Sequence, residues 1–158
     1  MKYLIVILFA VAGLATSCKK TTTVDIVNPN VDRRDRMVGT YAIGYNVVIR
    51  IGGGGAATNP ESYTGTLGVT KSTNNNELIL DFDAPGLKEK LTASLADSTF
   101  TILDKKTEPI IVNGTTFVGQ FTGSGMFVRD GGQQKVTYSG VSEDPTFRKI
   151  TILTGTKN

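Results

Sequence analysis

The chain has 158 residues, with 17 lysines and arginines against 14 acidic residues, one cysteine, no histidine and no tryptophan. A formal net charge of +3, without a stripe of basic and aromatic residues, excludes a nucleic-acid-binding protein. Without histidine the commonest general base and the commonest neutral metal ligand are missing, which excludes Ser-His, Cys-His, zinc and haem sites. We therefore predict no catalytic residue, no cofactor and no metal site, and we do not expect an enzyme.

The N-terminus has the three parts of a secretory signal. Lys2 is the only charged residue before Lys19, and residues 4–15 are almost wholly apolar. Small residues then lead into Cys18, the only cysteine of the chain. An apolar run of about a dozen residues is shorter than a membrane span requires. The sequence therefore predicts a signal peptide over residues 1–17, with cleavage before Cys18.

The segment Thr16-Ser17-Cys18-Lys19-Lys20 resembles the end of a Bacteroidetes-type lipoprotein signal. The resemblance implies a diacylglycerol on the Cys18 sulfur and an acyl chain, such as palmitate, on its amine. The membrane is then a partner through this lipid. No acidic residue follows before Asp25, which by the same resemblance favours the periplasmic face of the outer membrane over the cell surface. Ordinary secretion with a free thiol is the alternative, although a lone cysteine has no partner for an intramolecular disulfide.

The next segment, residues 18–36, is polar and contains Asn28-Pro29-Asn30. It shows no sustained hydrophobic period, so we predict a flexible tether between the lipid and the folded domain. A short helical turn is expected around residues 31–37. The basic cluster at residues 33–36 contains an acid, and we interpret it as a solvated junction. The folded domain is expected over residues 37–158.

From Met37 onward the apolar residues recur with a period of two. In residues 41–51 every odd position is large and apolar, which predicts a long strand with one buried face. At Gly123-Ser124-Gly125 the apolar residues change from odd to even positions, which suggests a bulge or sharp bend. The same reasoning predicts strands around residues 41–51, 63–70, 78–82, 91–95, 100–102, 110–112, 115–128, 136–138 and 147–153, with Ile150 and Ile152 on one side of the last one.

Eight or nine strands joined by short polar connections, without an amphipathic helix, predict an all-β fold. Sequential hairpins favour an antiparallel up-and-down meander, and closing it into a complete or nearly complete barrel removes exposed edges. A two-sheet β-sandwich is the alternative. At Gly39-Thr40-Tyr41, which opens the first strand, the chain resembles lipocalin-like (calycin-type) domains. That resemblance implies a barrel that holds a small hydrophobic ligand.

The interior of such a barrel is either filled by side chains or occupied by one ligand. The candidate ligand-binding residues are the large inward-facing ones: Tyr41, Ile43, Tyr45, Val47, Phe82, Phe117 and Phe121. We expect a small apolar or amphiphilic ligand. The alternative function is a ligand-free structural or protein-interaction module of a cell-envelope complex, whose partner the sequence does not identify. Hydrolysis by carboxylates is the third and least favoured function.

Three further motifs have ordinary explanations. The segment 81–86 has the start of a calcium loop, but Thr92 lies where the chelating acid is needed, so we predict a strand that ends in a turn. The glycine run 52–55 lacks the Gly-Lys-Ser/Thr of a phosphate-binding loop, and we predict a flexible loop at the barrel mouth. Surface solvation explains the acids at positions 104, 108, 143 and 144.

The triplet Asp97-Ser98-Thr99 resembles the O-glycosylation site of Bacteroidetes exported proteins, and that resemblance makes Ser98 the acceptor. An Asp-Ser pair is also a common hairpin turn. Both interpretations are retained.

Overall fold

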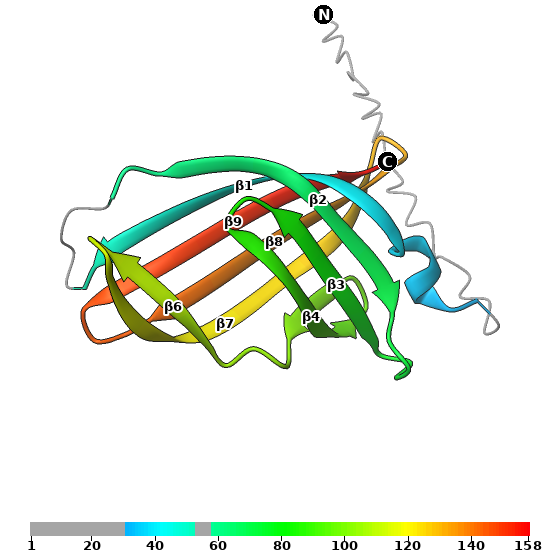
Figure 1. Ribbon diagram of the computed structural model, residues 1–158. Helices are drawn as coiled ribbons and strands as arrows, with labels where there is room; N and C mark the ends of the chain where they lie inside the picture. The colour runs from blue at the N-terminus through cyan, green and yellow to red at the C-terminus, as the bar shows by residue number, and fades with distance from the viewer. Residues whose placement is uncertain (1–30, 53–57) are drawn as a thin grey trace, which may run out of the picture.

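The computed structural model describes residues 31–52 and 58–158 and consists almost entirely of β-strands (Figure 1). Within these residues a single 3-10 helix, η1 (Arg33–Arg36), precedes the first strand. The strands are β1 (Gly39–Ile51), β2 (Glu61–Lys71), β3 (Glu77–Ala84), β4 (Leu87–Ala96), β5 (Thr99–Ile102), β6 (Thr107–Val112), β7 (Thr115–Asp130), β8 (Gln133–Glu143) and β9 (Phe147–Lys157).

All strand pairs are antiparallel and form one continuous sheet in the order β5-β4-β3-β2-β1-β9-β8-β7-β6. An additional pairing of β5 with β7 closes this sheet into an eight-strand barrel, and β6 is a ninth strand beside β7. This confirms the predicted all-β meander and barrel and excludes the two-sheet sandwich. The barrel is compatible with the lipocalin-like resemblance. No helix in the described part of the chain is long and apolar enough to cross a bilayer.

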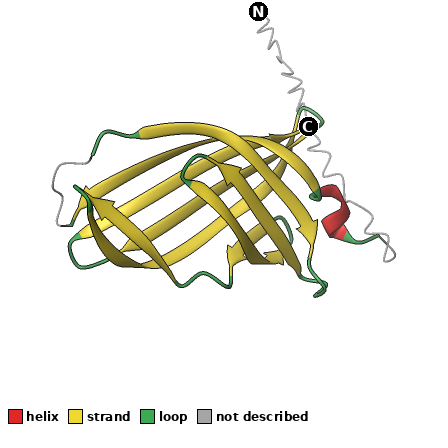
Figure 2. Cartoon of the chain, viewed as in Figure 1, coloured by secondary structure: helices red, strands yellow, loops and turns green. Residues whose placement is uncertain are grey.

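The two ends of the barrel differ (Figure 2). The β6–β7 hairpin and the β8–β9 hairpin lie at one end, together with the end of β1 and the start of β2, and we call this the open end. η1 and the C-terminus lie at the other end, which we call the η1 end (Figure 1). The core fills the η1 half, where aromatic and branched side chains of the inner face are almost completely buried, among them Tyr41, Leu67, Phe82, Phe100 and Phe127.

The predicted bulge in β7 is wrong. Residues 120–130 pair one to one with residues 143–133 of β8, without an extra residue. The odd-numbered residues of β7 continue to face inward through Gly123 and Gly125 to Phe127. Met126 lies on the outer face and is 44% exposed. The glycines make room for aromatic rings, because a Cβ at Gly125 would overlap the Phe100 ring. These glycines, which suggested a bulge, therefore allow close packing against aromatic rings.

In β9 the two isoleucines lie on one side of the strand, as predicted, and that side is the outer face. Its inner face carries Thr151 and Leu153, which are buried, whereas Ile152 is 54% exposed on the outer face. The register explains this, since Leu153 pairs with the inward-facing Tyr45 of β1. Two isoleucines at alternate positions therefore marked the outer face of this strand.

The basic cluster before β1 is not fully solvated. Arg34 is buried, and its guanidinium donates hydrogen bonds to the carbonyl oxygens of Ser72, Asn74 and Glu77, at 3.0, 2.6 and 3.2 Å. Asp32 caps η1 and accepts from the Arg34 side chain, which lowers the pKa of this carboxyl. The predicted helical turn is confirmed, and Arg34 fastens it to the β2–β3 connection.

One part of the barrel wall is held by side chains. Of β4, only the last four residues pair with β5, and within the described chain the segment 87–91 forms no strand pairing with β6. Thr92 accepts a backbone hydrogen bond from Leu103 at 2.9 Å. The Lys105 side chain lies between β4 and β6 and forms ion pairs with Glu89 of β4 and Glu108 at the start of β6, at 2.8 and 2.9 Å. We call this unpaired stretch of wall the β4–β6 seam.

Residues 31–158 contain all the described strands and a single hydrophobic core whose buried members come from η1's flank and from β1–β5 and β7–β9. Because each strand of this fragment packs against others within it, the fragment folds as one unit.

Candidate functional site

The apolar side chains of the inner face become less buried toward the open end of the barrel. In the η1 half its apolar side chains are buried, but near the open end the inward-facing Val47, Ile49, Tyr63, Phe117 and Phe147 are only half-buried. Interior apolar side chains of a filled barrel are normally covered on all sides. The open end is therefore an apolar rim that solvent reaches.

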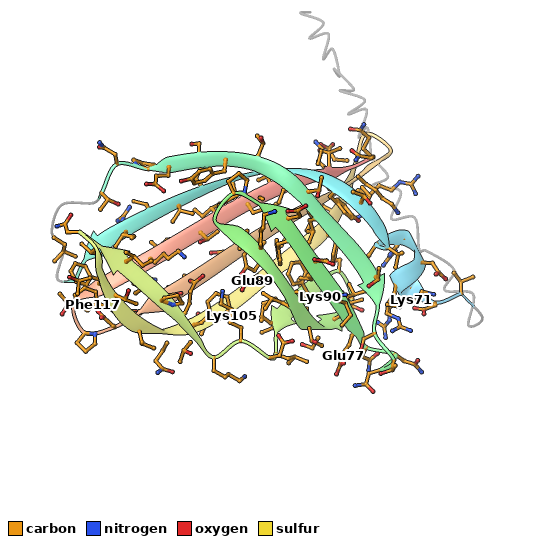
Figure 3. All side chains as sticks on the ribbon, in the orientation of Figure 1. Lys71, Glu77, Glu89, Lys90, Lys105 and Phe117 are labelled. Carbon is orange, nitrogen blue, oxygen red and sulfur yellow. The ribbon has the colours of Figure 1, made fainter. Side chains whose placement is uncertain are left out.

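The strands bring this rim together from four directions. Ile49 pairs with Lys149 and Ile51 with Phe147 across β1 and β9. The Phe117 ring of β7 packs against the Phe147 ring with centroids 4.6 Å apart. Tyr63 of β2 stacks on Tyr45 of β1 at 5.2 Å. Rings and branched side chains thus surround the open end, and Figure 3 shows Phe117 at this end of the barrel.

Charged residues lie inside the barrel beneath the rim. The Glu108 carboxylate forms ion pairs through Oε1 with Lys105 at 2.9 Å and with Lys149 at 3.2 Å. The Ser142 hydroxyl donates a hydrogen bond to Oε2 of the same carboxylate. Lys105 also pairs with Glu89 at 2.8 Å (Figure 3). The side chains of Lys105 and Glu108 are each 12% exposed. We call these five residues the charged cluster.

A glycine makes the cluster possible. Glu108 of β6 pairs with Gly119 of β7, which has no side chain to obstruct the inner face. A Cβ at Gly119 would lie 2.8 Å from the Ile110 side chain and 2.9 Å from the backbone nitrogen of Glu143. The Glu108 carboxylate therefore reaches across β7 to Ser142 and Lys149 on the next two strands.

The charges in the cluster offset one another. Burial raises the pKa of Glu108, but the hydrogen bonds from Ser142 and Lys105 and the positive charge of Lys149 outweigh it and hold that pKa below its usual value. Lys105 also lies 4.4 Å from the centroid of the Phe121 ring, an attractive cation–π arrangement. Among the described residues, no buried side-chain nitrogen or oxygen lacks a hydrogen-bond partner.

The neighbouring tyrosines are held in their protonated state. Burial, with a contribution from the charges of Glu89 and Glu108, raises the pKa of Tyr138. Burial alone raises the pKa of Tyr41 to about 12. The Tyr41 hydroxyl donates to the Met37 carbonyl oxygen at 2.7 Å, and the Tyr45 hydroxyl donates to that of Pro85. These hydroxyls are engaged in structural hydrogen bonds.

The structure divides the seven candidate ligand-binding residues into two groups. Tyr41, Ile43, Tyr45 and Phe82 are buried in the core. Val47 and Phe117 belong to the rim at the open end, and the buried Phe121 packs beneath Lys105. The rim and the core are thus adjoining regions of one inner face, since Val47 packs against the core cluster.

The sequence analysis missed the charged cluster. It assigned Glu108 to the surface, and this is wrong, because the carboxylate lies inside the barrel. For Glu89 the sequence did carry a sign of the inward position. It lies at the alternate position between Leu87 and Leu91, which are buried on the inner face. Of the other three acids, Asp104 accepts from the Thr92 amide, Glu143 is exposed, and Asp144 accepts from two amides in the β8–β9 turn.

The remaining candidates lie elsewhere. Ser98 is half-exposed in the confirmed turn between β4 and β5. Asp81 and Asp83 lie on β3 and face Lys90 and Lys88, at 3.9 and 2.9 Å, which confirms the predicted strand and turn. Cys18 and residues 53–55 of the glycine run lie outside the described residues.

The comparisons with known proteins give a limited result. No protein-family model and no curated protein matches the sequence. A crystal structure of a protein of unknown function from Bacteroides ovatus is similar, with a TM-score of 0.41 and 15% sequence identity. The similarity covers 76% of this chain and 41% of that protein, so this chain spans less than half of its length.

Proposed function

We propose that the protein is a lipid-anchored component of the cell envelope whose barrel binds a small amphiphilic molecule at the open end. The anchor is the acylated Cys18, at the periplasmic face of the outer membrane. The observation that supports ligand binding is the half-buried apolar rim above a charged cluster. An apolar tail lies favourably against Val47, Phe117 and Phe147, and a polar headgroup is satisfied by Lys149, whose side chain is the more exposed of the two lysines.

The ligand proposal predicts different results for two neighbouring residues of β7. Phe117 faces the rim, whereas Val118 faces outward and is 66% exposed. With fragment 31–158 and the fluorescent amphiphile 11-(dansylamino)undecanoic acid, Phe117→Ala is expected to weaken binding about tenfold, the effect of losing one well-buried aromatic contact. Val118→Ala should leave the dissociation constant unchanged. A fluorescence titration measures both values, with circular dichroism as the folding control.

Equal losses in the two variants, or no fluorescence change with the unmodified fragment, would contradict the ligand proposal. The second candidate function, contact with another envelope protein, is supported by the outer face of β6 and β7. There Ile111 and Val118 are 60% and 66% exposed. Exposed apolar side chains on adjacent strands favour a protein contact.

The anchor is tested separately, with the full chain in its own host. The intact mass of membrane-extracted protein is expected to show the loss of residues 1–17 and the addition of a diacylglycerol and one amide-linked acyl chain. Cys18→Ser should abolish this acylation, since no other thiol exists in the chain. An unmodified Cys18 in the wild-type protein overturns the anchor, and removal by protease from intact cells overturns the periplasmic placement. The same spectrum shows whether Ser98 carries a glycan.

A further inference from the structure

The outward-facing side chains of β1, β9, β8 and β7 form an uncharged surface. These four strands are consecutive in the sheet (Figure 1). Within the described chain, no charged residue occupies the middle outward positions of these strands, which are the alternate positions of 44–48, 150–154, 137–141 and 122–126. We call these positions the uncharged face. The outer side of β3 and β4 differs, because there aspartates of β3 face lysines of β4.

Apolar side chains lie at the centre of the uncharged face. Ile150 pairs with Val48 of β1 on one side and with Val141 of β8 on the other. These three side chains are half-buried, and the neighbouring Ile152 is 54% exposed. A surface with branched apolar side chains at its centre and no charge among them has the composition of the core of a protein–protein interface.

Opposite charges lie at the edge of this face, at the open end. Arg148 of β9 and Glu143 of β8 are register partners, and their side chains are 49% and 62% exposed. The contact between them is 4.0 Å long, so both remain accessible to a further partner. A hollow of about 340 Å³ beside β7, lined in part by Thr122 and Lys106, forms another edge.

We propose that the uncharged face binds a second copy of this chain, across a two-fold axis that runs along the strands between β8 and β9. Such an axis places β9 of one copy over β8 of its partner, so that register partners exchange places. Ile150 then packs on the partner's Val141. At the edge, Arg148 lies over the partner's Glu143, and this pairing of opposite charges occurs twice.

The face suits a copy of itself. Its centre carries no charge that would repel its own counterpart, and a two-fold axis makes the same patch serve both copies. With the positions at both ends, five outward residues on each of the four strands give about 20 residues a side, close to a standard interface. The axis also leaves both η1 ends on one side, as two tethers to one membrane require. The pairing itself rests neither on the lipid anchor nor on a ligand at the open end.

Sedimentation equilibrium of fragment 31–158, from low micromolar to submillimolar concentration, is expected to show a monomer–dimer equilibrium. Ile152→Asp should raise the dimer dissociation constant about thirtyfold, the effect of losing a central interface contact. Ile111→Asp is the matched control, because Ile111 is 60% exposed on the outer face of β6, outside the uncharged face. It should leave the dissociation constant unchanged. Circular dichroism checks folding, and a matched pair of threonine variants at positions 152 and 111 repeats the comparison if an aspartate variant does not fold.

Exchanging the edge charges tests the direction of the axis. Arg148→Glu alone should weaken the dimer, because it sets like charges against the partner's Glu143. Adding Glu143→Arg should restore the original dissociation constant. If the strands of the two copies ran in opposite directions, β8 would lie over β8 and position 143 over the partner's Lys135. The double variant would then set two positive charges together and would not recover.

Three outcomes overturn the proposal. A fragment that stays monomeric over the whole concentration range shows that this face does not bind its own copy. Equal effects at positions 152 and 111 show that a dimer forms through another surface. A double charge variant as weak as Arg148→Glu shows that the axis does not run along the strands. None of these results bears on the fluorescent amphiphile at the open end, so failure of one proposal is distinguishable from failure of the other.

Discussion

Replacing Glu108 with alanine is expected to lower the free energy of unfolding of fragment 31–158 by about 3 kcal/mol. The substitution removes the recorded partner of Lys149 and one of the two partners of Lys105, and both lysines remain inside the barrel. Breaking a buried ion pair from one side costs about 3–5 kcal/mol. The lower end applies here because the Lys149 side chain is 19% exposed and gains some hydration. Urea unfolding at neutral pH measures the change.

Glu143→Ala is the matched control. Glu143 lies on β8 with its side chain 62% exposed, and its contact with Arg148 is 4.0 Å long. A surface ion pair of this kind contributes less than about 1 kcal/mol. If the two alanine variants lost equal stability, the charged cluster would not hold the barrel together as we describe.

The cluster also predicts the direction of an acid effect. The folded-state pKa of Glu108 lies below its usual value of 4.5. Its contribution to stability is therefore fully present above about pH 4.5 and is lost as the pH falls through the lower folded-state value. Glu108→Gln keeps the shape but not the charge, so its unfolding free energy should fall less steeply with acid than that of the wild-type fragment.

The second large effect is expected from Gly125→Ala. A Cβ at this position would overlap the carbonyl oxygen of Thr137 and the ring of Phe100, so the buried ring and the β7–β8 pairing must both shift. Overpacking of a filled core costs about 1–3 kcal/mol. We expect about 3 kcal/mol, because backbone as well as side chain is displaced.

Gly68→Ala is the control for this glycine. Gly68 lies on the outer face of β2, and an added Cβ would meet only the Asp81 Cβ at 3.6 Å and the Asp81 carbonyl oxygen at 3.8 Å, which are ordinary contacts. Its unfolding free energy should stay the same or rise by up to about 1 kcal/mol. Combining Gly125→Ala with Phe100→Leu should cost less than the sum of the two single changes. Strict additivity would show that the ring is not the obstacle.

Much of the barrel could be predicted because burial of one face imposes a period of two on the sequence. The long alternation in β1 and the turns at residues 85–86, 113–114 and 131–132 all lie where the pattern placed them. β9 shows the limit of this reasoning. Thr151 and Leu153 face inward although Ile150 and Ile152 are the more apolar pair, because the register with β1 decides the face.

The charged cluster could not be predicted in the same way. Its members come from β4, β6, β8, β9 and the segment before β6, and they meet only after the barrel closes. A pattern along one strand contains no information about that meeting. Arg34 was missed for the same reason, since the carbonyl oxygens it binds lie 38 to 43 residues away.

The β4–β6 seam has a consequence for what holds the barrel wall closed. Elsewhere around the circumference, widening the barrel breaks rows of backbone hydrogen bonds. At the seam, the Lys105 ammonium and its two carboxylates link β4 to β6, next to the backbone hydrogen bond from Leu103 to Thr92. Because Lys105 and Glu108 are each only 12% exposed, added salt screens this link weakly, and charge holds the wall along this one line where backbone ladders hold it elsewhere.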